Sequence, residues 1–181
     1  MPYLNVEIKA RCQEPARIRN YLELNQAEFR GMDEQTDTYF HTNGGRLKLR
    51  EGHIENNLIY YERGNQVGPK QSQFMLVKVE DAQGLKQALE KSNGIKVVVK
   101  KKREIYYIRN VKFHLDTVPG LGTFVEIEAG NLLLPLTTEQ LREQCDFYMD
   151  QLGIQEADLI ELSYSDLLLD TKTGKEEQSF I

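Results

Sequence analysis

Residues 4–11 of the chain read LNVEIKAR, and this stretch contains the pattern that decides the fold. Apolar side chains alternate with polar or charged ones, as expected for a strand whose successive side chains point to opposite faces of a sheet. Asn5, Glu7 and Lys9 share one face, whereas Val6 and Ile8 share the other. The stretch therefore predicts a strand with one apolar face and one strongly charged face.

The same alternation recurs along the chain. Charged side chains share a face in one strand at Arg46, Lys48 and Arg50, in another at Lys101 and Arg103, and in the last at Glu126 and Glu128, with single members at Arg63 and Asp116. The positions between them are mainly aliphatic or aromatic. Six predicted strands thus carry a charged face, with positive charges in some strands and carboxylates in others.

A solvated outer face is the more common explanation for any single strand of this kind. Six such strands weaken that explanation, because neighbouring charges of one sign are usually avoided on a bare surface. If the charged faces turned inward, the sheet would close into an inverted barrel whose apolar face is covered by helices. Unpaired charges inside it would be very costly. A bound polyanion with a divalent metal ion would satisfy them, because arginine and lysine bind phosphate oxygens and carboxylates bind the metal.

Periodicity and turn residues predict the elements. Strands are expected at Leu4–Arg11, Gln35–His41, Arg46–Arg50, Leu58–Arg63, Phe74–Val79, Val97–Ile108, Lys112–Val118 and Thr123–Ala129. Helices are expected at Pro15–Gln26, Asp81–Ser92, Thr138–Leu152 and Ala157–Leu169, with Thr138 as a helix cap. The segment Gln66–Gln73 is expected to be a mobile loop. Short turns such as Asn43-Gly44-Gly45 favour antiparallel pairing, so the fold class is α+β.

Composition limits the class of protein. A chain of 181 residues with 40% hydrophobic and 28% charged residues predicts one globular domain, over residues 1–170, followed by a frayed tail over 171–181. No run approaches the roughly 18 apolar residues of a membrane span, and Met1 to Cys12 lacks the apolar core of a signal peptide. We therefore expect a cytoplasmic protein with free thiols at Cys12 and Cys145. The net charge of −5 disfavours nucleic-acid binding, including RNA binding through residues 96–103.

Other chemistries find little support in the sequence. His41, His53 and His114 lack the spacing of a zinc site, so each is predicted to be a surface residue or a satisfied one rather than a ligand. Gly120-Leu121-Gly122 lies between two predicted strands and opens no helix, so it is a turn rather than a dinucleotide-binding motif.

Several motifs together resemble the CYTH superfamily, which groups class IV adenylate cyclases with thiamine triphosphatases and inorganic triphosphatases. Residues 5–9 resemble its ExExK signature, residues 48–50 its basic strand, residues 63–64 its Lys-Gly, residues 101–103 its KxR and Asp116 its metal-binding Asp. Residues 120–128 resemble GLGxFxExE, and residues 163–168 resemble the closing SYxxLL. The resemblance runs from Leu4 to Leu168, and the motifs occur in the family's order.

The resemblance implies a closed or nearly closed eight-stranded antiparallel β-barrel with flanking helices, known as a triphosphate tunnel. It implies that Mg²⁺ or Mn²⁺ is bound by Glu7, Asp116, Glu126 and Glu128. It also implies that the phosphates of a nucleoside triphosphate, or of another triphosphate, are held by Lys9, Lys48, Arg50, Arg63, Lys101 and Arg103. It assigns no catalytic residue, and it leaves a homodimer open.

The chain departs from the family pattern at two places. Asn5 replaces the first Glu of ExExK, which removes a charge that could help to hold a second metal ion. Gln73-Phe74-Met75 stands where Arg-x-Glu is expected, so the substrate group recognised there is in doubt.

The expected reaction is that of a class IV adenylate cyclase, which converts ATP to cyclic AMP and pyrophosphate. The overall length and the helix that follows the last acidic strand resemble those enzymes. Hydrolysis of inorganic triphosphate or thiamine triphosphate is an alternative, because it needs the same neutralisation of charge on the phosphates. A second alternative is a non-catalytic sensor of polyphosphate or nucleotide, which Asn5 favours.

Overall fold

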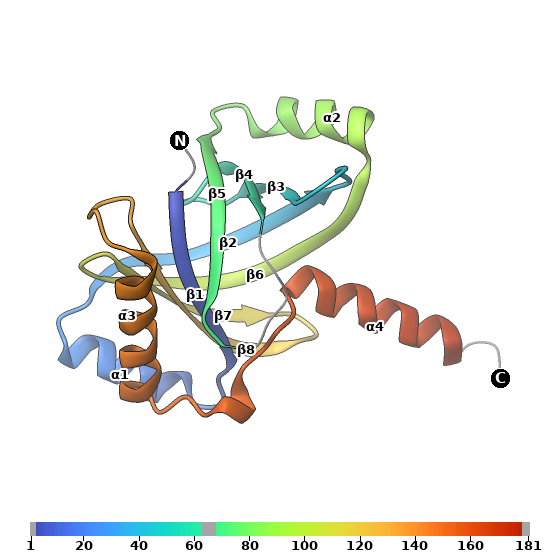
Figure 1. The fold of residues 1–181 in the computed structure, drawn as a ribbon. Coiled ribbons are helices and arrows are strands. Elements are labelled where there is room, and N and C mark those ends of the chain that lie inside the picture. The colour runs from blue at the N-terminus through green and yellow to red at the C-terminus, as the bar shows by residue number, and fades with distance from the viewer. Residues whose placement is uncertain (1–2, 63–67, 179–181) are drawn as a thin grey trace.

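Eight antiparallel strands pair edge to edge into a closed ring in the computed structural model, which describes residues 3–62 and 68–178 (Figure 1). The order around the ring is β1-β5-β4-β3-β2-β6-β7-β8, and β8 pairs with β1 to close it. The strands are β1 Tyr3–Arg11, β2 Glu28–Phe40, β3 Arg46–Glu51, β4 Asn57–Glu62, β5 Lys70–Lys78, β6 Ile95–Ile108, β7 Val111–Val118 and β8 Gly122–Gly130. The predicted α+β barrel is confirmed.

Four α-helices and one 3₁₀ turn accompany the barrel in the part of the chain that the structure describes. They are α1 Pro15–Leu24, α2 Ala82–Asn93, α3 Thr138–Gln151, the turn Glu156–Asp158 and α4 Tyr164–Gln178. Figure 1 shows α1 and α3 together on the outside of the barrel, and α4 running away from it. None of the helices in the described part of the chain combines the length and the apolar character that crossing a bilayer requires.

The main hydrophobic core lies outside the ring, between the barrel and two helices. Val6 and Ile8 on β1, with Phe113 on β7 and Ile127 on β8, are at most 1% exposed, and they pack against buried residues of α1 and α3 such as Leu141. Burying each large aliphatic or aromatic side chain contributes about 1.5–3 kcal/mol. This outward apolar face leaves the charged faces of β1, β2, β3, β6, β7 and β8 pointing inward.

A second cluster fills one part of the barrel interior. It contains Tyr39 of β2, Tyr61 of β4, Val99 of β6, Phe124 of β8 and Tyr164 at the start of α4. Leu167 and Leu168 of α4 pack against it. The beginning of α4 thus plugs the interior with apolar and aromatic side chains.

Two strands are longer than the sequence indicated. β2 begins at Glu28 rather than at residue 35, because its pairing with β6 continues past a bulge at Gly31, whose φ of 126° suits only glycine. β5 begins at Lys70, so residues 70–73 are strand rather than part of a mobile loop. Arg63 and residues 66–67 of that predicted loop lie outside the described residues.

The helical predictions need three corrections. The cap of α3 is Thr137, not Thr138, because the Gln140 amide donates to the Thr137 side chain. The predicted helix at 157–169 is wrong in its first half, where the short turn Glu156–Asp158 is followed by an irregular segment before α4 begins. The backbone of α4 then continues to Gln178, past residue 171, where we expected a tail to begin.

Candidate functional site

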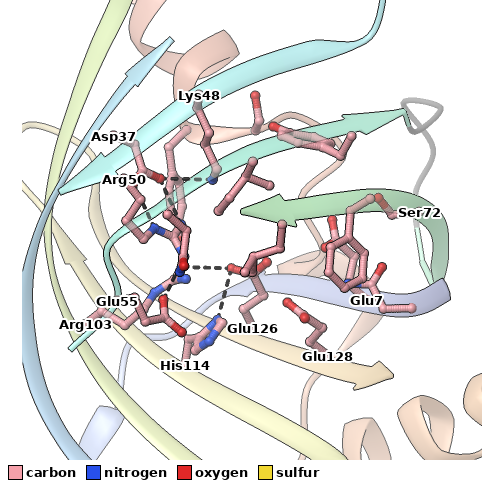
Figure 2. Close-up of a pocket in the computed structure, with 18 of the residues that line it drawn as sticks. Glu7, Asp37, Lys48, Arg50, Glu55, Ser72, Arg103, His114, Glu126 and Glu128 are labelled. Carbon is pink, nitrogen blue, oxygen red and sulfur yellow. Dashed lines mark hydrogen bonds and ion pairs between the residues drawn. The ribbon is translucent and has the colours of Figure 1, made fainter. Parts of the chain in front are cut away.

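The inward faces of the strands line a charged cavity inside the barrel (Figure 2). Its charged lining residues are Glu7, Lys9, Asp37, Lys48, Arg50, Glu55, Lys101, Arg103, Lys112, Glu126 and Glu128. The charges come from six strands and from the β3–β4 loop, which contributes Glu55.

Three cations converge on one buried carboxylate, Asp37 of β2. Its oxygens accept hydrogen bonds from Lys101 Nζ at 2.7 Å, Lys48 Nζ at 3.0 Å, and Arg50 Nε and Nη2 at 2.8 and 2.9 Å. Burial raises the pKa of Asp37, but the charges of Arg50, Lys101 and Lys48 outweigh it and hold that pKa well below 3.8. Burial also lowers the pKa of Lys101 well below its ordinary value. One carboxylate therefore holds in place three cations that could take phosphate oxygens.

Glu55 extends this cluster from the β3–β4 loop. It accepts a hydrogen bond from Arg50 Nη1 at 2.8 Å and pairs with Lys112 of β7. The loop is fixed by Asp33, whose carboxylate accepts the backbone N–H groups of His53, Ile54 and Glu55 at 2.7, 3.1 and 3.0 Å. These contacts place the Glu55 side chain over the tunnel.

A second cluster surrounds Arg103 of β6. Its guanidinium donates from Nε and Nη2 to the two oxygens of Asp116 at 2.7 and 2.6 Å, a bidentate arrangement. The same Nη2 donates to Glu126 at 3.1 Å. The hydroxyl of Tyr164 donates to Asp116 at 2.7 Å, and Lys9 Nζ lies 4.0 Å from the centre of the Tyr164 ring. Asp116 thus positions Arg103 and Tyr164.

The β8 carboxylates face titratable side chains on both neighbouring strands. Glu126 lies opposite Lys9 on β1 and opposite His114 on β7. Glu128 lies opposite Lys112 on β7 and opposite Glu7 on β1. Two carboxylates directly opposite each other repel unless a cation lies between or beside them. Oxygen donors of this kind suit Mg²⁺ or Mn²⁺, so this part of the tunnel fits a divalent cation.

His114 is buried beside these carboxylates. Its side chain is 2% exposed, and Nδ1 lies 3.6 Å from Glu126 Oε2, too far for a hydrogen bond. Both ring nitrogens are buried and have no hydrogen-bond partner among the described residues. Burial, with the charges of Arg103 and Lys112, lowers the pKa of His114 to about 4, so the ring is neutral at pH 7. The prediction that His114 is a surface or satisfied residue is wrong.

The two clusters give the tunnel opposite local charges. Around Asp37 and Glu55, four cationic side chains (Lys48, Arg50, Lys101 and Lys112) outnumber the two carboxylates. Around Arg103 of β6, four carboxylates from β1, β7 and β8 (Glu7, Asp116, Glu126 and Glu128) outnumber the two cations Lys9 and Arg103. One part of the tunnel therefore attracts anions and the other attracts cations.

The cavity also has an apolar wall. Ile59 of β4 and Phe74 and Leu76 of β5 line it, and Ile59 pairs directly with Leu76 across the two strands. Asn57 and Ser72 add neutral polar groups on the same strands. A ligand in this cavity meets charges on one side and a largely neutral surface on the other.

The structure brings together most of the residues that the sequence singled out. Lys9, Lys48, Arg50, Lys101, Arg103, Glu7, Glu126 and Glu128 all line the cavity. Arg63 lies outside the described residues, and both oxygens of Asp116 are engaged by Arg103. The sequence reasoning missed the roles of Asp37, Glu55 and Lys112, of which Lys112 alone had a signal, since it shares a strand face with Asp116.

Known proteins share this chain's sequence pattern and fold. The family model of the CYTH domain matches residues 4–164. A protein of Methanocaldococcus jannaschii named "putative adenylate cyclase" is 30% identical over 176 residues, which cover 91% of this chain and 98% of that protein.

Solved structures show the same fold. A structure from Vibrio parahaemolyticus, described as a "putative adenylate cyclase", has a TM-score of 0.76 and 21% identity, covering 93% of this chain and 99% of that one. A Hippeastrum protein described as a "putative adenylyl cyclase" with dominant triphosphatase activity has a TM-score of 0.61 and 12% identity, covering 94% and 96%. At such low identities these two structures speak for the fold alone.

Proposed function

The chain belongs to the CYTH domain family, and from that premise we propose that it is a metal-dependent adenylate cyclase that converts ATP to cyclic AMP and pyrophosphate. Membership of this family makes the chain an enzyme but does not specify its reaction. The choice of reaction and substrate rests on the chemistry of the cavity and on the name of the archaeal relative.

The observation that carries the proposal is that the cavity has two different walls. The cationic side, around Lys48, Arg50 and Lys101, matches a chain of phosphates. The neutral side, with Ile59, Phe74 and Leu76, offers a surface for an organic group. Inorganic triphosphate has no group to place there, whereas a nucleoside has a base and a ribose.

The phosphates of the substrate would replace Asp37 as the partner of its cations. Lys48, Arg50 and Lys101 already point at one acceptor, so little reorganisation is needed when phosphate oxygens arrive. In the reaction, the ribose 3′-hydroxyl loses its proton to solvent and its oxygen forms a bond to the α-phosphorus. The bond from that phosphorus to the β-phosphate oxygen breaks, and its electron pair leaves with pyrophosphate. The cations stabilise the charge that develops on the departing pyrophosphate.

The carboxylates of β1 and β8 would hold the metal ion. Glu7, Glu126 and Glu128 are the residues that fit it, because they lie on facing positions of paired strands. When bound, a divalent ion neutralises phosphate charge and polarises phosphoryl oxygens. Arg103, positioned by Asp116, contributes a fixed positive charge next to this group.

Product analysis tests the proposal. The protein is incubated with ATP, tripolyphosphate or thiamine triphosphate, each with Mg²⁺ or Mn²⁺, and the products are separated and identified. We expect cyclic AMP and pyrophosphate from ATP. A Lys101→Met variant, checked for folding by circular dichroism, is the control that excludes a contaminating enzyme. Free phosphate as the product, or no product from any substrate, contradicts the cyclase assignment.

Hydrolysis of a triphosphate is the second candidate, and one observation favours it. Glu128 faces the cavity and makes no hydrogen bond or ion pair with the residues that the structure describes. A carboxylate in this state can take a proton from an attacking water. Release of phosphate from thiamine triphosphate or tripolyphosphate in the same experiment would select this alternative.

A further inference from the structure

The His114 side chain and the β8 carboxylates form a compact group of donor atoms. One ligand atom each from His114, Glu126 and Glu128 lies within 4.8 Å of the others. Ligands about 2.0–2.2 Å from a shared ion are separated by at most about 4.4 Å, so a shift of a few tenths of an ångström closes the group around an ion. Figure 2 shows the His114 ring directed toward Glu126.

The state of the imidazole is the independent observation that points to a ligand. Both nitrogens of His114 are buried inside the tunnel, and neither has a hydrogen-bond partner within residues 3–62 and 68–178. An unpaired buried polar group costs about 1–3 kcal/mol, and such groups are rare without a functional reason. A neutral imidazole can donate a nitrogen lone pair to a metal ion. Together with two carboxylates it gives the mixed nitrogen and oxygen ligand set that transition-metal ions accept.

We infer that His114 is a direct metal ligand together with Glu126 and Glu128, which makes this a mixed nitrogen and oxygen site that favours Mn²⁺ over Mg²⁺. Mg²⁺ prefers oxygen ligands, whereas first-row transition metals accept imidazole readily. The inference rests on the proposed function only in placing a divalent cation in the tunnel. It adds a ligand and a choice of metal that the carboxylates alone do not specify.

Pulsed electron paramagnetic resonance of Mn²⁺ bound to the full chain, without nucleotide, tests the inference directly. A coordinated imidazole nitrogen gives ¹⁴N modulation, and carboxylate ligands give none. We expect this modulation in the wild-type protein and its loss in a His114→Phe variant. Titration should show that the variant binds Mn²⁺ at least about tenfold more weakly, since even residues that only support a ligand are worth about 10–100-fold in affinity. Mg²⁺ affinity should change much less.

His41→Gln and His53→Gln are the matched controls, because both histidines are exposed. Each control should keep the ¹⁴N modulation and the Mn²⁺ affinity. Absence of ¹⁴N modulation from wild-type protein with bound Mn²⁺, absence of Mn²⁺ binding, or unchanged modulation in a folded His114→Phe variant would overturn the inference. Because the wild-type spectrum is itself decisive, a variant that fails to fold does not remove the test.

The outcome is separable from that of the proposed reaction. Production of cyclic AMP by a protein whose Mn²⁺ shows no ¹⁴N modulation contradicts only the role of His114. Conversely, ¹⁴N modulation in a protein that produces no cyclic AMP contradicts only the cyclase assignment.

Discussion

Asp37 accepts hydrogen bonds from Lys48, Arg50 and Lys101, the three cations that we propose hold the phosphates. Its carboxylate keeps three buried cations from repelling one another, and it orders their side chains before any ligand arrives. Removing one partner of a buried ion pair is strongly destabilising, because it leaves charge without compensation.

An Asp37→Asn variant should therefore lose about 3–5 kcal/mol of unfolding free energy at neutral pH. Tripolyphosphate should restore part of this loss, since an anion then takes the place of the carboxylate. Chemical denaturation with and without tripolyphosphate measures both effects. Equal stability of variant and wild type would show that the three cations are neutralised in another way.

The pH dependence of this difference follows from the pKa of Asp37, which lies well below 3.8 in the folded protein. A depressed carboxyl pKa contributes stability that is fully present above the unfolded value and is lost as pH falls through the folded value. The difference in unfolding free energy between wild type and Asp37→Asn should stay constant from pH 8 to about 5 and shrink only below about pH 4. Denaturation curves at a series of pH values test this, and a difference that already shrinks near pH 6 would contradict it.

Glu126 is the carboxylate on which Lys9, Arg103 and His114 converge. Glu126→Gln removes its charge with little change in volume, so we expect turnover to fall at least about a hundredfold, equivalent to roughly 3 kcal/mol in the barrier. The rate is measured at saturating Mg²⁺ and Mn²⁺. Glu34→Gln, on an exposed outward position of β2, should leave the rate unchanged. Near-normal activity of Glu126→Gln would remove Glu126 from the metal site.

Sequence alternation predicted Lys9 and Lys48 because each lies between apolar neighbours. Lys101 and Arg103 lie among other charged residues, so their assignment depended on the face that they share and on the family resemblance. Asp37 was not singled out because its neighbours Thr36 and Thr38 are polar, so the sequence shows no alternation around it. Glu55 lies on a loop, where no periodicity applies, and its position depends on the backbone contacts of Asp33. Spacing rules for zinc ligands could not identify His114, because its partners are supplied by strand register rather than by sequence separation.

At the level of elements, the start of α4 has a physical explanation in its sequence. Ser163 and Asp166 form a reciprocal cap, in which the Asp166 amide donates to Ser163 Oγ and the Ser163 amide donates to the Asp166 carboxylate. Asp166 also accepts a hydrogen bond from Arg46 of β3 at 2.8 Å. The cap orients Tyr164 into the barrel and the ion pair ties the helix to a strand.

Asp166→Ala should loosen α4, because it removes both the cap contact and the ion pair. We expect a loss of about 1–2 kcal/mol, the upper part of the range for a helix cap. Hydrogen exchange of residues 164–171 should increase while that of β7 and β8 stays slow. Asp150→Ala, at an exposed position of α3, is the control. Unaltered exchange in α4 would mean that Leu167 and Leu168 alone hold it on the barrel.

Elements were predictable where the spacing of apolar residues and the position of turn residues indicated the same boundaries, as for β1, α1 and β7. The extent of β2 was not, because the bulge at Gly31 breaks the alternation of its first half. The start of α4 was missed for a different reason. The apolar residues 159 and 160 belong to a segment that pairs briefly with β1 through Ala10 and Leu159, which only the tertiary fold determines.

For the whole molecule, the cluster of cations in the tunnel predicts that phosphate ligands raise the melting temperature. A triphosphate can contact cations from several strands at once, so its binding should raise the melting temperature. A ligand at 100 times its dissociation constant adds about 2.7 kcal/mol. AMP, at the same concentration as ATP or tripolyphosphate, should stabilise much less, because it has one phosphate. Equal shifts for AMP and ATP in thermal unfolding experiments would contradict a site built for three phosphates.

Closure of the ring also has a consequence in time. Within the ring, the first strand pairs with residues 70–74 and 124–130, so that Asn5 lies opposite both Ser72 and Gly130. At about 5–20 residues per second, synthesis separates the two ends of the β1–β8 pair by on the order of ten seconds. Until β8 has been made, β1 keeps one edge unpaired, and such long-range pairing is typical of folding in milliseconds to seconds rather than microseconds. The nascent chain therefore carries an unpaired strand edge and solvated charges. The charged tunnel is complete only when β8 pairs with β1.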